Sequence, residues 1–534
     1  MKNSIQHFSE EGIKNLEKVQ ENLAMHPDDL ASYIQAVKDE VINLGLEIIQ
    51  ETLETFDDML RNSSIRKEKW EIVRKDKKQL ITSLGTVCFD KTLFREKESK
   101  KSKYLLDDFL KLDKHQRMTE DAVAELLKET AETSYRKGGI ATSINDDVSK
   151  ETVKDIIHGL KFPCMEKPTQ KKQVDYLYID ADEDHVSLQF QKKKGDLERD
   201  SRGYKKNCAV AKLIYVYEGI EKDAPESKRH QLVNPYYFCG TYEGTDNEKM
   251  WNEVYQYIES HYEIDKIKKI FLNADGGAWI KAGKKQIRGI TYVLDEFHMR
   301  KYLTKMTSHM LDSEQEVREI LCNTIKNGTK EDFRKGITVI ADYETTESGK
   351  KRVWEAGEYF LSNWSAAQIR LKNRNIVKGC SAEGHVSHVL SARMSSRPMG
   401  WSRLGADQMA HLRAYMWNGG DMLELARYQR KESVEKMEKE KPILTYREAM
   451  KDLYMKRSET AVYTEKMQCS ISNQLKHTLA QGMHSYNLHR FVAKKDKIEK
   501  IWFYRICEWR HQMYVIVRMM YFIYQGGLYE RAIK

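Results

Sequence analysis

The sequence has little proline and glycine, with only 7 and 28 of 534 residues. This scarcity argues against a collagenous or low-complexity design. Long apolar runs are also missing: the most apolar stretch, residues 513–524, is too short to span a bilayer and contains Arg518. The mean hydropathy is -0.70, and the first twenty residues contain no apolar signal-peptide core. We therefore expect no membrane insertion and no export, and a cytoplasmic protein.

Cysteine pairs of the kind that bind zinc are absent as well. The eight cysteines include no C-x-x-C pair, and none forms a Cys-His cluster at zinc-ligand spacing. We interpret them as buried thiols of a reducing compartment. The sequence thus predicts neither a disulfide framework nor a structural zinc site.

Positive charge is in excess but unevenly placed. The chain has 90 Lys and Arg against 81 Asp and Glu, and residues 421–534 alone have 22 against 14. Residues 61–103 have a second excess, 14 against 6, so the rest of the first 420 residues is net acidic. Basic flanks around an acidic middle are typical of a protein that holds a polyanion with its flanks and acts on it at its centre.

The N-terminal text predicts a helical region with a hairpin, over residues 1–103. Apolar residues recur at helical spacing within 7–60, and alternating apolar residues around the SLGTV turn predict a hairpin near 70–98. Short helices follow in 104–165, and the last of them bears Lys150 and Lys154. This region resembles a helix-turn-helix whose lysines contact DNA. An ordinary surface helix in a bundle is an equally good interpretation.

The strongest pattern begins after Pro168. Three apolar strands, a helix and then strands alternating with helices predict an α/β fold with a mixed sheet of the ribonuclease H type, over residues 172–415. Helical text at about 304–375 predicts an insertion within this domain, whose aromatic residues should mostly form its own core. Residues 416–534 are expected to form a basic helical tail. The first three expected strands lie near 176–190, 209–220 and 235–244. The fourth, in 267–279, ends in Asp-Gly-Gly, and the fifth, in 289–303, runs straight into a helix.

Acidic residues lie where these strands end or break. Asp180, Asp182 and Asp184 are spaced by two and share one strand face, and Asp275 ends the fourth strand. Glu383 lies in a turn that leads into a helix. In the ribonuclease H arrangement the first and fourth strands are neighbours. Such carboxylates would bind two Mg²⁺ or Mn²⁺ ions, roughly 3.5–4 Å apart, for phosphodiester chemistry.

Each acidic segment also has a simpler explanation. Asp275 with its two glycines fits an ordinary turn, the Asp180–Asp184 segment fits a solvated strand end, and helix starts favour a residue such as Glu383. A calcium loop is a poor match because the glycine and distal glutamate of an EF-hand loop are missing. The metal-site hypothesis therefore depends on the three segments lying together.

The motifs resemble, as a set, those of bacterial insertion-sequence transposases of the ISLre type. The resemblance covers roughly residues 60–415 and is carried by YLYIDADEDHVSLQ, IFLNADGGAWIK, YVLDEFHMRKYL and CSAEGHVSHVLSARMSSRPMGWS. It implies a ribonuclease H-like DNA transposase that binds terminal inverted repeats, cleaves there with Mg²⁺ or Mn²⁺, and joins the freed 3′-hydroxyl to target DNA. It further implies double-stranded DNA as partner, a homodimer or higher assembly on DNA, and the bacterial nucleoid as location.

The same resemblance assigns site residues by position. It implies the triad Asp182, Asp275 and Glu383 as catalytic metal ligands, with Asp180 as the alternative first ligand. Asp295 and His298 resemble an Asp-x-x-His element, in which His298 is an auxiliary residue or simply a helix-start histidine. The expected DNA contacts beside the site are Arg393, Arg397 and Trp401, although core packing is the better interpretation of Trp401.

Two rival functions remain open on this evidence. A ribonuclease H-like nuclease would use the same carboxylates but hydrolyse without joining. A catalytically inactive, transposase-derived DNA-binding repressor would use only the basic flanks.

Overall fold

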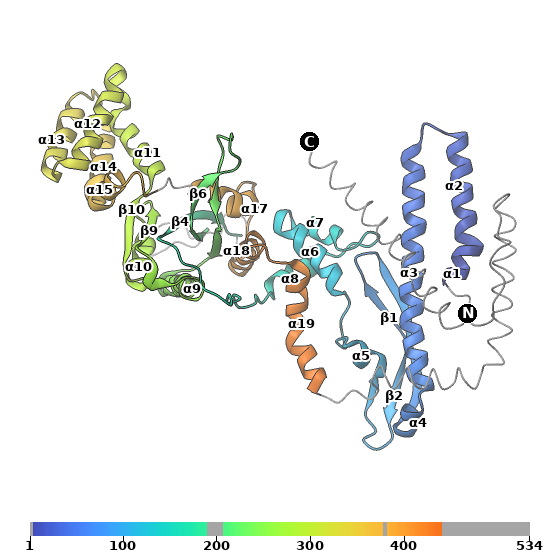
Figure 1. Cartoon of the computed structure of the whole chain (residues 1–534). Helices are drawn as coiled ribbons and strands as arrows, with labels where there is room; N and C mark the ends of the chain where they lie inside the picture. Colours follow the sequence, from blue (N-terminus) through green and yellow to red (C-terminus); the bar gives the residue numbers. More distant parts are fainter. Residues whose placement is uncertain (1–3, 190–206, 378–381, 440–534) are drawn as a thin grey trace, which may run out of the picture. The chain divides into compact units, whose positions relative to one another are not determined.

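The computed structural model describes residues 4–189, 207–377 and 382–439 (Figure 1). Its N-terminal part is helical, as predicted for residues 7–60. The long helix α3 begins after Asp29, whose side chain accepts a hydrogen bond from the Ser32 amide. The helices of this part are α1 (Ser4–His7), η1 (Phe8–Gly12), α2 (Ile13–Met25), α3 (Leu30–Asn62) and α4 (Ser64–Lys69).

The predicted hairpin is present. Strands β1 (Trp70–Ile81) and β2 (Thr86–Glu96) pair antiparallel, and β3 (Ser102–Tyr104) adds to β2. Alternate side chains of the hairpin face α3 and α5 (Leu105–Leu110), and they form a separate small core with residues of these helices. The hairpin and α3 thus stabilise each other.

Three short helices follow, α6 (Glu120–Glu132), α7 (Tyr135–Ala141) and α8 (Lys150–His158). Ser134 and Ser149 cap α7 and α8 by accepting backbone N–H groups. The apolar faces of α6 and α8 belong to the same core as one face of the central sheet. This three-helix unit is therefore packed as part of the α/β region, and whether it is a helix-turn-helix stays a prediction.

The centre is a five-stranded mixed sheet with the order β10-β9-β4-β5-β8. Strand β4 pairs parallel with β9 and antiparallel with β5, so the expectation that the first and fourth strands are neighbours is confirmed. A separate two-stranded sheet joins β6 (Gly219–Lys222) and β7 (His230–Val233). The central strands are β4 (Tyr176–Ser187), β5 (Cys208–Tyr217), β8 (Tyr236–Gly240), β9 (Lys269–Ala274) and β10 (Ile290–Leu294).

Helices cover both faces of this sheet because the side chains of each strand alternate between them. Odd-numbered residues of β4 such as Leu177 and Ile179 pack in one core with α9 and α10. Even-numbered ones such as Tyr178 and Val186 pack in another with α18 and the segment around α16. These helices are η2 (Gly244–Asp246), α9 (Asn247–His261), η3 (Ile264–Lys266), α10 (Ala278–Gln286), α16 (Ala382–Val386), η5 (Ser387–Ser391), α17 (Ala392–Met394) and α18 (Arg403–Trp417).

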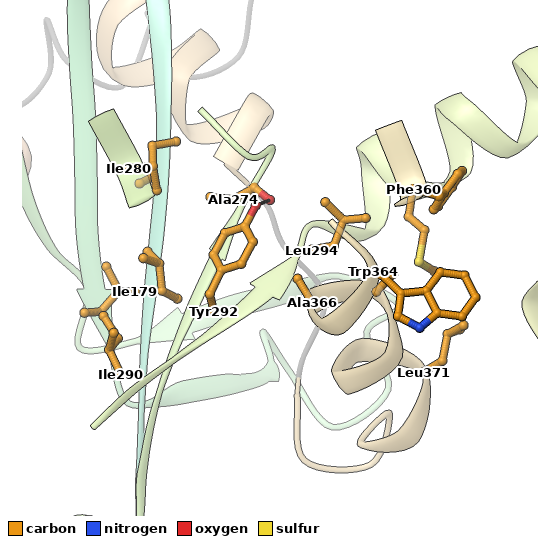
Figure 2. Close-up of a cluster of buried hydrophobic side chains, with 14 of the residues drawn as sticks. Ile179, Ala274, Ile280, Ile290, Tyr292, Leu294, Phe360, Trp364, Ala366 and Leu371 are labelled. Carbon is orange, nitrogen blue, oxygen red and sulfur yellow. Dashed lines mark hydrogen bonds between the residues drawn. The ribbon is translucent and has the colours of Figure 1, made fainter. Parts of the chain in front are cut away.

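The predicted helical insertion follows β10 directly. It has its own apolar centre, in which Phe333 packs against Phe360 and Trp364, and α15 joins this centre to β10 (Figure 2). Of the aromatics expected there, Trp364 is buried while Trp354 is 39% exposed. The helices are α11 (Glu296–Thr307), η4 (Ser308–Ser313), α12 (Glu314–Asn327), α13 (Lys330–Asp342), α14 (Glu347–Ser362) and α15 (Trp364–Lys372).

The last described element is α19 (Met422–Lys439), which begins within the expected basic tail. The remainder of that tail, from residue 440 onward, lies outside the described residues. None of the helices in the described part of the chain is long and apolar enough to cross a bilayer.

Candidate active site

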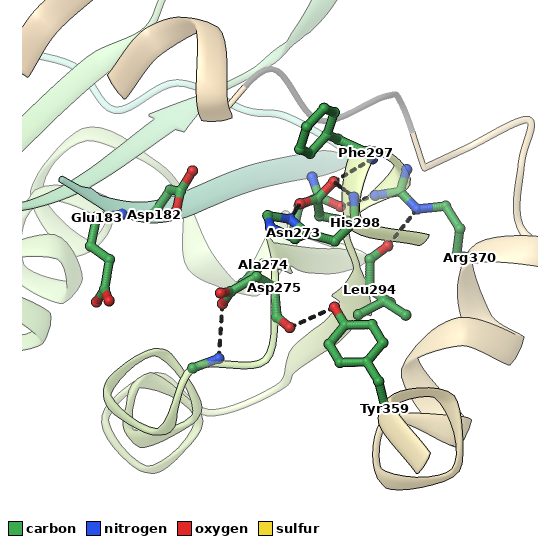
Figure 3. A network of polar contacts seen from close by, with 12 residues as sticks. Asp182, Glu183, Asn273, Ala274, Asp275, Leu294, Phe297, His298, Tyr359 and Arg370 are labelled. Atoms are coloured by element: carbon green, nitrogen blue, oxygen red, sulfur yellow. Dashed lines mark hydrogen bonds and ion pairs between the residues drawn. The ribbon is translucent and has the colours of Figure 1, made fainter. Parts of the chain in front are cut away.

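Two aspartates meet at one edge of the sheet. In the parallel pair β4–β9, Asp180 lies opposite Asn273, and two positions further along each chain come Asp182 and Asp275. Asp182 lies within β4, which continues to Ser187, and Asp275 directly follows the end of the neighbouring parallel strand β9 (Figure 3). Asp275 begins the turn after β9, and its Oδ1 accepts the Gly277 amide at 2.8 Å.

The charges that act on the carboxyl group of Asp182 include those of Asp275 and Asp295. The pKa of Asp182 is raised to about 6, first because the carboxyl is largely buried and also because Asp275 and Asp295 are negatively charged. The backbone amide of Glu183 and the nearby His298 act in the opposite direction. Two carboxyl groups that repel each other in a partly desolvated edge would be stabilised by a cation.

Asp295 and His298 form a second pair beside them. Asp295 follows β10, caps α11 through the amides of Phe297 and His298, and contacts His298 Nδ1 through its other carboxylate oxygen. This hydrogen bond raises the pKa of His298, and the charges of Asp275 and Asp182 raise it further. The imidazole is thus held in place beside the acidic edge.

Asp180 has a different environment from Asp182. It is fully buried and accepts hydrogen bonds from Tyr215 Oη at 2.7 Å, Tyr217 Oη at 3.1 Å and Asn273 Nδ2 at 2.7 Å. Its oxygens are therefore occupied by neighbouring strands. This favours Asp182 over Asp180 as the first ligand of the proposed site.

The helical insertion holds this edge through hydrogen bonds from two of its residues. Buried Arg370 of α15 donates to the Leu294 carbonyl at 2.9 Å and to Asn273 Oδ1 at 2.8 Å, which links β9 and β10 (Figure 3). Tyr359 of α14 donates from its hydroxyl to the Asp275 carbonyl at 2.7 Å. One weak signal for this network is visible in the sequence, the polar Asn273 within an apolar strand, whereas the two insertion residues have none.

Glu383 lies at the start of α16 and is exposed. Helix α16 packs against β4, and its Val386 shares a core with Tyr178, on the sheet face to which Asp182 belongs. The four residues that lead into this helix, 378–381, lie outside the described residues. Within the described ranges, no group of three or more His, Cys, Asp or Glu side chains is close enough to hold a metal ion. The structure brings together Asp182 and Asp275, and Glu383 stays a prediction as their third partner.

The expected DNA contacts near the site divide into two kinds. Arg393 is buried: its Nε donates to the Thr130 carbonyl at 3.0 Å, and its guanidinium lies 4.7 Å from the Trp401 ring centre. Trp401 is also buried and donates from Nε1 to the Met394 carbonyl. Contrary to the expected phosphate contact, Arg393 is a packing residue in this structure, and the packing interpretation of Trp401 is supported. Arg397 remains exposed.

The lysines expected to contact DNA, Lys150 and Lys154, are exposed on α8 and pair with the adjacent Glu151 and Asp155, at 3.7 and 3.0 Å. Exposed pairs of this kind contribute little to stability, so the lysines remain available to a phosphate. Their role in DNA binding stays a prediction.

Asp182→Asn should change how stability depends on pH. The carboxyl of Asp182 has a higher pKa in the folded than in the unfolded chain. Its ionisation therefore destabilises the folded state as the pH rises through about 4 to 6. In EDTA, raising the pH from 5 to 7.5 should therefore stabilise the variant relative to the wild type by roughly 1–2 kcal/mol. Urea denaturation at both pH values measures this difference, and an unchanged difference would contradict the raised pKa of the Asp182 carboxyl.

Comparison with known proteins gives the family. A family model described as an uncharacterised protein family, UPF0236, matches residues 25–432. The chain belongs to UPF0236. One UPF0236 protein of Caldanaerobacter subterraneus subsp. tengcongensis is 35% identical over 413 residues, which cover 77% of this chain and 83% of that protein. Another from the same organism is 36% identical over 405 residues, 76% of this chain and 81% of the relative.

Among solved structures, the Drosophila P element transposase strand transfer complex matches 61% of this chain and 84% of the other, with 11% identity and a TM-score of 0.20. A likeness at this score carries no argument about the fold or the activity of the UPF0236 chain.

Proposed function

We propose that this UPF0236 protein is a DNA transposase that cleaves and joins DNA strands with divalent metal ions, in a ribonuclease H-like domain. The observation that carries the proposal is the pair Asp182 and Asp275 on neighbouring parallel strands, with Asp182 within β4 and Asp275 just past the end of β9. Burial, and in addition the charge of Asp275, raise the pKa of Asp182. A carboxyl group with a perturbed pKa, such as that of Asp182, beside the carboxyl end of a parallel strand is typical of functional sites.

The topology supports the same class. Numbered along the chain, the main strands lie in the order fifth, fourth, first, second, third, with the first three antiparallel and the last two added in parallel. The ribonuclease H interpretation of the sequence expects the first and fourth strands to be neighbours, as they are here. Helices of both cores cover the two faces of the sheet.

The relatives add an argument of another kind. One UPF0236 protein of Caldanaerobacter has a single name that joins eleven loci of that organism. Many copies of one protein in one genome are expected when a protein moves its own gene. This repetition favours a mobile-element function over a housekeeping nuclease or a single repressor.

The carboxylates fit a hard divalent cation in their chemistry. Oxygen ligands from Asp182 and Asp275 suit Mg²⁺ or Mn²⁺, and their mutual repulsion gives a reason for a cation to bind there. When bound, the metal would activate an attacking oxygen and stabilise a leaving oxygen at a phosphodiester. Glu383 is the proposed third ligand, because its helix packs against β4 on the Asp182 side.

The protein's own residues would orient the reacting groups. Arg370 and Tyr359 hold the strand ends that bear the carboxylates, so Asp275 keeps its place when DNA binds. His298 is positioned by a hydrogen bond with Asp295, which raises the pKa of its imidazole, and when protonated it would donate a hydrogen bond to a phosphate oxygen. The exposed Lys150, Lys154 and Arg397 are proposed to contact phosphates of the double-stranded DNA around the site. Two copies of the chain would hold the two element ends.

The proposal is tested by metal-dependent cleavage. The purified full chain should cut DNA that carries the sequences flanking its own reading frame when Mg²⁺ or Mn²⁺ is present, and the cuts should lie at terminal inverted repeats. EDTA should abolish cleavage. DNA binding without any cleavage in either metal would instead support the inactive, repressor-like alternative.

A further inference from the structure

A pocket of about 500 Å³ opens beside Asp275, between the turn after β9 and the helical insertion. One wall is Asp275 with Gly276, and the others come from α10, α11 and α14. A volume of this size suits a small ligand or one unit of a polymer. The pocket adjoins the proposed metal ligand Asp275, but its lining contains neither Asp182 nor Glu383. The catalytic roles proposed above do not use it.

Three exposed cations line the pocket, and each comes from a different helix. They are Lys281 of α10, Lys305 of α11 and Arg352 of α14. Lys305 Nζ lies 4.6 Å from the Tyr302 ring centre, and Arg352 makes a long ion pair of 3.5 Å with Glu344, outside the pocket lining. These contacts leave N–H donors for an anion.

The pocket also offers hydrogen-bond acceptors. Asn363 is only 7% exposed, and its Oδ1 has no hydrogen-bond partner among the described residues, while its Nδ2 donates to the Tyr359 carbonyl at 3.0 Å. A buried acceptor left without a donor is costly, which indicates a ligand or a water there. The carboxylates of Glu355 and Glu358 also line the pocket, and Glu355 pairs with Lys351 at 3.9 Å.

Glycine at position 276 allows the Asn363 side chain to lie close to the turn after β9. A Cβ at this residue would lie 3.0 Å from Asn363 Oδ1, and the backbone has φ +105°, which side chains rarely adopt. The close approach places the unpartnered oxygen directly against the turn that begins with Asp275. The acceptor and the proposed metal ligand therefore border the same pocket.

We propose that this pocket holds one nucleotide of the DNA strand next to the bond that is cleaved. An inorganic phosphate would use only the cations and would be repelled by Glu355 and Glu358. A nucleotide uses both sets of groups, because its phosphate accepts from Lys305 and Arg352 while the N–H groups of its base donate to Asn363 Oδ1. This inference rests on the proposed function, and it makes the insertion part of the substrate site.

The test compares Lys305→Ala/Arg352→Ala with a control of equal charge, Lys330→Ala/Lys335→Ala, whose exposed lysines lie on α13 and do not line the pocket. DNA affinity of the full chain is measured by fluorescence anisotropy over a KCl series in EDTA, with a duplex that carries one element end. The pocket variant should lose affinity about 10-fold or more, and its salt slope should fall by about 1–2, since each lost phosphate contact removes roughly 0.9.

Asn363→Leu supplies an independent readout, because it removes the acceptor without changing charge. With a duplex whose bases beside the cleaved bond are replaced by abasic sites, wild type and Asn363→Leu should bind equally, whereas the intact duplex should bind the variant several-fold more weakly. Equal affinity and slope in wild type and the double variant would overturn the nucleotide pocket. If the wild type cleaves DNA in a parallel reaction, that result leaves the proposed function standing; a wild type that binds as expected but never cleaves would reject the function instead.

Discussion

Asp275→Ala should abolish Mg²⁺-dependent DNA strand cleavage, by about 10³-fold or more, while DNA affinity stays within about twofold. Asp275 begins the turn at the end of β9, opposite the position of Asp182 on the parallel strand β4. Its loss removes a charge that raises the pKa of Asp182 and one of the two neighbouring carboxylates proposed to hold the cation. Because phosphate contacts provide most DNA affinity, binding should persist.

A matched control is available in the same domain. Asp265 is exposed in η3, before β9, and Asp265→Ala removes an equal charge without touching the acidic edge. That variant should cleave at the wild-type rate. Undiminished cleavage by Asp275→Ala, or an equal loss in both variants, would contradict the assignment. Glu383→Gln, measured in the same assay, shows whether the exposed glutamate of α16 is the third ligand.

Arg370→Met is expected to have the largest effect on stability. Arg370 is 1% exposed, and it connects the Leu294 carbonyl of β10 with the Asn273 side chain of β9. Asn273 in turn donates to the buried carboxylate of Asp180. Methionine fills similar space but leaves these buried acceptors unsatisfied, which should cost about 3 kcal/mol or more.

Thermal unfolding measures this cost. A loss of that size should lower the Tm of the α/β region by roughly 6–12 °C. The control is Arg374→Met, an exposed arginine shortly after α15, which should shift the Tm very little. An unchanged Tm for Arg370→Met would mean that the network does not hold the insertion to the sheet.

The sequence predicted the sheet and its acidic edge because both depend on local patterns. Alternating apolar residues predict strands, and the order of strands and helices predicts a ribonuclease H arrangement. In that arrangement the first and fourth strands are neighbours, as the structure shows. That single inference placed Asp182 beside Asp275. The hairpin and the helical insertion were predicted in the same way, from periodicity within short segments.

Contacts between distant segments were beyond such reasoning. The resemblance implied that Arg393 contacts DNA beside the site, yet Arg393 is buried and its Nε donates to the carbonyl of Thr130, 263 residues earlier. Asp180 and Asp182 have equivalent positions in the pattern. In the structure they are distinguished by the hydrogen bonds that Asp180 accepts from the tyrosines of β5 and from Asn273 of β9. Arg370 and Tyr359 act through backbone carbonyls, which have no sequence signature.

The central claim is that the acidic edge joins DNA strands as well as cutting them. Its most direct test incubates the full chain and Mg²⁺ with a labelled duplex, which has a free 3′-hydroxyl at the element end, and with supercoiled plasmid. We predict that the label becomes covalently attached to the plasmid, and that Asp275→Ala yields no such product. Cleavage of the plasmid with no transfer of label would contradict the claim and identify a nuclease.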